Sequence, residues 1–229
     1  MYRNAVFYFI GLLLVLVGGF WTSYFSKLGG DISFEQHFHG ISMLLWALLL
    51  IAQAWFIRSG RRPIHRTVGK LSGLLAPAVI VSGVYVVLDN IGKQKIPYTQ
   101  DGLSIFWFGV FLVLMFAIVY SLAIYHRKDL QLHQRYMAST ALVFLVPGLS
   151  RLFGKIGNTF EIWTPNFFQT LLIPGIITLI MIFDDYRKGK MRSPWLVVAA
   201  LWCVCVWGYM NLYKYPWWTG FADWCRTLV

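Results

Sequence analysis

Five histidines are the side chains of this sequence best suited to bind a metal, a heme or a polar ligand. His37 and His39 lie two residues apart in the stretch FEQHFHG, directly before a long apolar run. On a helix, residues at i and i+2 point about 200° apart, so the two imidazoles cannot hold one heme iron from both sides. We therefore expect His39 to face the protein interior and His37 to face the surface.

The other three histidines come from two connections that could converge. His65 lies in RRPIHRTVGK and is followed by Arg66, His126 ends one apolar run, and His133 opens the next. Three imidazoles with an open fourth position suit zinc, and imidazole also binds copper or iron. Arg135, two residues after His133, favours an anion instead, such as a phosphate headgroup or a heme propionate. A metal site, an anionic site and simple helix caps all remain open here.

A second polar cluster is expected at the opposite membrane face. Arg151 lies about one turn inside the end of its apolar run, and Asp89 ends another run on the same side. An ionisable group within a membrane is costly and usually has a partner, so we expect Asp89 to pair with Arg151. With His39 at similar depth, the cluster could hydrogen-bond a quinone carbonyl or bind an anion. The alternative is a buried ion pair that only fixes helix packing.

Hydropathy predicts that membrane-spanning helices position these residues. The chain is 58% hydrophobic and 13% charged, with a mean hydropathy of +0.61, whereas soluble domains carry about 25% charged residues. Apolar blocks of roughly 20 residues must be helical in lipid. We predict an all-α polytopic membrane protein, with residues 1–229 forming one domain and a bundle of seven transmembrane helices. The expected spans are residues 4–26, 36–58, 68–91, 103–125, 133–153, 166–186 and 194–213.

The first block could instead be a signal peptide, but its length and the absence of a small-residue cleavage pattern favour a span. The distribution of lysine and arginine predicts a cytoplasmic N-terminus and an outer C-terminus. The net charge of +11 then reflects topology and contact with anionic headgroups on the cytoplasmic side. No soluble basic domain is expected that could hold nucleic acid. The expected location is the bacterial inner membrane, with a membrane-protein partner or a second copy of the chain as candidate partners.

Two stretches resemble a broad family of uncharacterised bacterial multi-pass membrane proteins. They are HFHGISMLLWALLLIAQ…RRPIHRTVGK, with an H-R-x-x-G element, and HQRYMASTALVFLVPGLSRLF, with an H-x-R-x-M element. The matching positions are His39, His65, Arg66, Gly69, His133, Arg135, Met137 and Arg151. The resemblance covers about residues 35–153 and brings no settled activity. It implies that these positions outrank His37 and His126, which lie outside the pattern.

Four function classes follow from these residues. The first is a redox-associated membrane protein that binds heme, a transition metal or a quinone through histidines near the membrane faces. The second is a transporter or binding protein for a small molecule or an anion, and the third is a structural or assembly subunit of a membrane complex. The weakest is a metal-dependent hydrolase, for which Asp129 is the one obvious carboxylate near the predicted histidine cluster.

Overall fold

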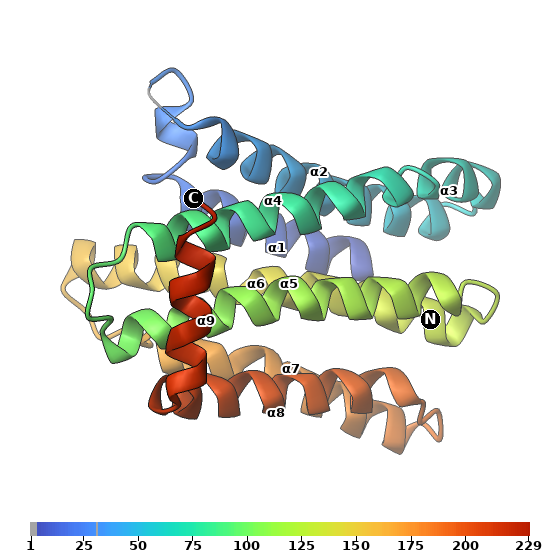
Figure 1. Cartoon of the computed structure of the whole chain (residues 1–229). Helices are drawn as coiled ribbons and strands as arrows, with labels where there is room; N and C mark the ends of the chain where they lie inside the picture. Colours follow the sequence, from blue (N-terminus) through green and yellow to red (C-terminus); the bar gives the residue numbers. More distant parts are fainter. Residues whose placement is uncertain (1–3, 31) are drawn as a thin grey trace.

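The computed structural model describes residues 4–30 and 32–229, and helices make up the regular structure of this part of the chain. The elements are α1 (Ala5–Phe20), η1 (Phe25–Lys27), α2 (Phe34–Arg58), α3 (Arg62–Gly69), α4 (Ser72–Gly92), α5 (Gln100–Tyr125), α6 (Leu130–Phe160), α7 (Phe167–Arg187), α8 (Ser193–Asn211), η2 (Leu212–Lys214) and α9 (Pro216–Arg226). The long helices run back and forth along one axis, and α9 crosses them at the end where the chain finishes (Figure 1). The prediction of an all-α architecture is confirmed.

The two ends of the bundle carry different parts of the predicted chemistry. We call one of them the His39 end. It holds the starts of α2, α5 and α7 and the ends of α1, α4, α6 and α8. The opposite end, which includes α3, is called the His65 end. The helix α1 begins at the His65 end and the chain finishes at the His39 end (Figure 1).

Six helices in the described part of the chain are long and apolar enough to cross a membrane: α2, α4, α5, α6, α7 and α8. They match six of the predicted spans closely. The helix α1 has 16 residues, which is shorter than the predicted block 4–26. At 1.5 Å per residue it is about 24 Å long, against a hydrocarbon core of about 30 Å. The coarse prediction of a polytopic membrane bundle is confirmed by these six helices.

Side-chain caps set several of the helix starts. Ser33 accepts from the Gln36 N–H at 3.4 Å, and Thr99 accepts from the Gly102 N–H at 3.0 Å. Asp129 accepts from two backbone N–H groups, those of Gln131 and Leu132, at 2.8 and 3.1 Å. Each cap satisfies an N–H group that has no partner inside its helix. Asp129 therefore begins α6, and this accounts for the carboxylate considered above for a hydrolase.

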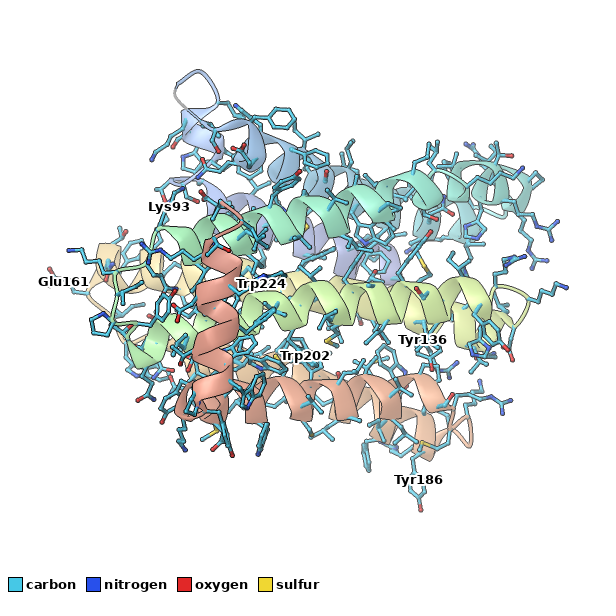
Figure 2. All side chains as sticks on the ribbon, in the orientation of Figure 1. Lys93, Tyr136, Glu161, Tyr186, Trp202 and Trp224 are labelled. Carbon is cyan, nitrogen blue, oxygen red and sulfur yellow. The ribbon has the colours of Figure 1, made fainter. Side chains whose placement is uncertain are left out.

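Two regions differ from or extend the sequence-based expectation. The helix α6 continues to Phe160, well past the predicted end at residue 153, and finishes where Glu161 adopts a left-handed φ of 53°. The aromatic segment at the end of the chain forms the helix α9. Its Trp218 and Ala222 are buried against the bundle, whereas Trp224 is exposed (Figure 2). A helix with one buried face lying across the bundle fits a position at the membrane interface.

The core is built from aromatic residues and close helix contacts. Trp46 of α2 is fully buried, packs edge-on against Phe116 of α5, and donates from Nε1 to Thr140 Oγ1 of α6 at 3.2 Å. The helices α1 and α6 meet where Gly19 lies directly against the backbone of Gly148. These contacts hold α1, α2, α5 and α6 in fixed relation around the candidate site.

Candidate functional site

At the His65 end, Arg135 forms a buried ion pair with Asp185 of α7. Its Nε donates to Oδ2 and its Nη2 donates to Oδ1 of Asp185, both at 2.8 Å. Arg135 is 3% exposed and Asp185 is 5% exposed. The Nη1 group donates to the backbone and side-chain oxygens of Gln131, at 2.9 and 2.6 Å. Protein oxygens therefore occupy the position in which an anionic ligand was expected.

Asp185 was missed in the sequence analysis, although a signal for it is present. It lies in the stretch FDDYR at the end of a predicted span. A carboxylate at that depth requires a cation, because an unpaired charge in a membrane is costly. Arg135 on the facing helix meets that requirement, but the pairing of α6 with α7 cannot be read from spacing along the chain.

The H-R-x-x-G element docks onto α2 through Gln53. With its amide nitrogen toward His65, Gln53 donates to Nδ1 and to the carbonyl oxygen of His65, the latter at 3.0 Å, and accepts from the Gly69 N–H at 3.1 Å. Gln53 is buried, and Arg66 is exposed. Burial lowers the pKa of His65, and neighbouring His133 and Arg66 lower it further. This element thus has a structural role in fixing α3.

His133 and His126 also make contacts within the protein. His133 Nδ1 donates to the Ala123 carbonyl oxygen at 2.8 Å, which joins the start of α6 to the end of α5. The His126 ring stacks on Tyr136 with centroids 5.9 Å apart, toward the end of the bundle opposite Lys93 (Figure 2). Within residues 4–30 and 32–229, no group of three or more His, Cys, Asp or Glu side chains is placed to hold a metal ion. The expected metal site of His65, His126 and His133 is therefore not assembled.

A large cavity lies at the His39 end. It has a volume of about 980 Å³ and is enclosed by α1, α2, α4, α5 and α6. Its walls are mainly apolar and include Leu16, Phe20, Met43, Leu44, Ile80, Val87, Phe108, Leu112, Phe116, Val143 and Phe144. Polar side chains among its lining residues are Ser23, Tyr24, Gln36, His39, Asp89, Asn90, Gln94, Ser150, Arg151, Thr164 and Asn166. Apolar walls with a few polar groups are typical of binding sites for small organic ligands.

His39 presents one ring nitrogen to this cavity as an acceptor. His39 Nδ1 lies 3.2 Å from the Ser82 hydroxyl, which also lies 3.1 Å from the Val79 carbonyl oxygen. When the hydroxyl donates to that carbonyl, its oxygen accepts from His39 Nδ1–H. A neutral imidazole protonated on Nδ1 carries a lone pair on Nε2. Among the described residues, none donates a hydrogen bond to that Nε2. The Ser82 contact thus orients the His39 ring, and in the tautomer protonated on Nδ1 the Nε2 lone pair is available as an acceptor.

Arg151 supplies hydrogen-bond donors to the same cavity. Its Nη1 donates to the Pro147 carbonyl oxygen at 3.0 Å, and its guanidinium lies 4.4 Å from the centroid of the Phe20 ring. Arg151 is close enough to His39 for the two side chains to interact electrostatically. In the part of the chain that the structure describes, its other N–H groups meet no acceptor. A held guanidinium with spare donors is suited to an oxygen-bearing ligand.

The expected ion pair between Arg151 and Asp89 is not formed. Asp89 Oδ2 instead accepts from Lys93 Nζ at 2.6 Å, in a largely exposed pair at the His39 end, where Figure 2 labels Lys93. Lys93 lies one turn further along the same helix, so it reaches Asp89 without any tertiary contact. Both Asp89 and Arg151 line the cavity, but as separate polar groups.

The two histidines of FEQHFHG have different neighbours, although both are half-buried and His37 does not face the surface as expected. His39 lines the cavity, whereas the described residues that line it do not include His37. His37 Nδ1 lies 3.3 Å from the Tyr24 hydroxyl, and the two rings meet edge to face. Tyr24 in turn packs against Gly40, where a side chain would collide with its ring. His37 therefore helps to fix the connection between α1 and α2.

No protein-family model, curated protein or solved structure matches this chain. At the His65 end the motif residues His65, His133 and Arg135 bond to protein groups. At the His39 end, His39 and Arg151 line a cavity, and among the described residues the other N–H groups of Arg151 have no acceptor.

Proposed function

We propose that this chain is a redox-associated membrane protein that binds a lipid-soluble quinone or quinol in the cavity at the His39 end. The observation that carries the proposal is the pairing of an acceptor, His39 Nε2, with the spare donors of Arg151 in one mainly apolar cavity of about 980 Å³. A quinone has an apolar body with two carbonyl acceptors, and the quinol has two hydroxyl donors. The site offers a partner for each kind of group.

The two side chains have complementary roles in this proposal. Arg151 donates to a quinone carbonyl oxygen, and His39 Nε2 accepts from a quinol hydroxyl. The apolar walls enclose the ring and the first part of an isoprenoid chain. The proposal concerns binding of both forms and includes no electron-transfer step.

Heme is a second candidate ligand, because His39 has one ring nitrogen in contact with Ser82 and the other available to bind iron. A ligating histidine usually donates its other ring N–H to a protein oxygen, and Ser82 fills that position for His39. Nε2 would then bind the iron on one side only, with Arg151 near the propionates. An absorption spectrum of the purified protein decides between the two, because a bound heme gives an intense Soret band and a quinone does not.

Titration with a short-chain benzoquinone tests the main proposal. The protein is purified in mild detergent, and binding is followed by quenching of tryptophan fluorescence. Loss of one neutral hydrogen bond in His39→Gln is expected to weaken quinol binding by about 2- to 12-fold, from roughly 0.5–1.5 kcal/mol. Loss of a charged donor in Arg151→Gln is expected to weaken quinone binding more, by about 10- to 150-fold.

His37→Gln is the matched control, since it removes an imidazole two residues away that faces Tyr24. It is expected to bind the quinol with wild-type affinity. Equal losses in the His37 and His39 variants would contradict the assignment of His39. Failure of the wild-type protein to retain or titrate any quinone would remove the proposal itself.

The membrane setting of the site is also part of this proposal. We propose that α1 is a seventh span, that the His65 end faces the cytoplasm of a bacterium, and that the chain lies in the inner membrane. Arg58, Arg61, Arg62, Arg66, Lys70, Arg127 and Lys128 gather in or next to the connections at that end and support this orientation. We also propose that the chain belongs to the family it resembles and that its His65 end contacts anionic lipids. Its proposed partner is a second copy of the chain or another membrane protein.

A further inference from the structure

A second, smaller pocket lies beside the apolar cavity at the His39 end, and we call it the polar pocket. Its volume is about 370 Å³, and it is lined by Gly19, Thr22, Ser23, Arg151, Lys155, Asn158 and Thr159. Arg151 lines both spaces, whereas Lys155 lines the polar pocket and lies outside the described lining of the apolar cavity. The polar pocket therefore offers a separate binding position on the far side of Arg151.

The unexpected length of α6 creates this pocket. The sequence predicts the end of the span at residue 153, but the helix continues to Phe160. The extension places Lys155 four residues after Arg151, with Asn158 and Thr159 one turn further. Residues with this spacing share a helix face, so the two cations and two polar side chains point in one direction. The turn after α1 adds the hydroxyls of Thr22 and Ser23 on the other side.

The charges of the polar pocket are uncompensated by the protein. Its lining includes two cations and, among the described residues, no carboxylate. Like charges four residues apart on a helix repel each other. The helix dipole favours cations only within about the last turn, and Arg151 lies nine residues before the final residue of α6. Arg151 and Lys155 are both exposed, so an external anion can reach the two cations together.

Aromatic side chains place the polar pocket at headgroup depth. Trp21 directly precedes Thr22, and Trp163 follows the end of α6; both are exposed. Exposed tryptophans at helix ends mark the interface between hydrocarbon and water. Phosphate groups of lipids lie at this level, and their chains would extend beside the apolar cavity.

We propose that the polar pocket binds a phosphate-type anion through Arg151 and Lys155, with the hydroxyls of Thr22, Ser23 and Thr159 as further donors. The ligand is the phosphate of an anionic lipid or free inorganic phosphate, which share this chemistry. The polar pocket shares Arg151 and Ser23 with the apolar cavity, whereas Lys155 and Thr159 line the polar pocket and are not among the residues that line the apolar cavity. A change at Lys155 therefore tests anion binding separately from quinone binding.

Thermal unfolding of the full-length protein in detergent tests the site. The added probes are dioctanoyl phosphatidic acid, dioctanoyl phosphatidylcholine as a control with equal chains and no net charge, and inorganic phosphate. The tested variant is Lys155→Gln. Its matched control is Lys95→Gln, which removes one exposed lysine from the same end of the bundle without touching the pocket. Equal midpoints of the two variants without additives establish that both are folded.

Phosphatidic acid is expected to raise the unfolding midpoint of the wild-type protein and of Lys95→Gln. Lys155→Gln is expected to need about fivefold more of this lipid for the same rise, because each cation near the membrane surface contributes roughly 1 kcal/mol. The same pattern with inorganic phosphate would support the site and identify free phosphate as its source. Equal shifts with phosphatidylcholine, equal responses of Lys155→Gln and wild type, or no shift with either anion would overturn the proposal.

Discussion

Breaking the Arg135–Asp185 ion pair is predicted to destabilise the protein severely. In Arg135→Met the Asp185 carboxylate, 5% exposed, loses both of its 2.8 Å charged hydrogen bonds. Removal of one partner from a buried pair typically costs about 3–5 kcal/mol, because a charge is left without compensation. That corresponds to a factor of roughly 10² to 10⁴ in the ratio of folded to unfolded protein.

Two companion variants divide this cost into its parts. Arg135→Lys keeps the charge but cannot form the two-pronged contact, so its loss should lie between wild type and Arg135→Met. The double variant Arg135→Met/Asp185→Leu replaces the pair with apolar side chains. It is expected to recover most of the stability, since buried pairs themselves contribute little net free energy.

The free energy of unfolding is measured by titrating the detergent-solubilised protein with sodium dodecyl sulfate and following tryptophan fluorescence. Losses below about 1 kcal/mol for Arg135→Met, or a double variant as unstable as the single, would refute the reasoning. The same samples also report on function. If Arg135 bound an external anion instead, Arg135→Met would abolish anion-dependent stabilisation while leaving the unliganded protein as stable as wild type.

Two further predictions concern packing and pH. In Gly19→Ala the new Cβ would overlap the backbone carbonyl of Gly148, which is held within α6, so a loss of about 1–3 kcal/mol in unfolding free energy is expected in the same titration. Gly11→Ala on the same helix has no neighbour within 4 Å and should be neutral or slightly stabilising; equal losses would show that α1 does not pack on α6 at Gly19. Burial lowers the pKa of His65 below its ordinary value of 6.5, so the folded protein favours the neutral imidazole. The free energy of unfolding therefore falls as the pH drops below about 6.5 toward the folded-state pKa. His65→Gln should therefore lose less stability than wild type between pH 7 and pH 5, measured by thermal unfolding, and parallel pH curves would contradict this role for His65.

The sequence by itself predicts the helices well, because lipid demands long apolar blocks whose backbone bonds close within the helix. The six helices that are long and apolar enough to cross a membrane follow from that demand. The division between His39 and His37 also follows from the chain alone, since helical spacing fixes which residues share a face. Arg151 and Asp89 are also singled out by their depth along the chain, whereas Asp185 is not.

Only the tertiary structure decides which partners these residues have. Arg135 meets Asp185, which lies 50 positions away in sequence, and Gln53 joins His65 to α2. Asp89 pairs with Lys93 within its own helix, and this leaves Arg151 with spare donors. The reason is physical: apolar helix surfaces can pack in many pairings of similar energy, and small residues such as Gly19 and Gly148 select among them by contact. At the His65 end, His65, His133 and Arg135 are thereby bonded to protein groups, and at the His39 end His39 and Arg151 line a cavity.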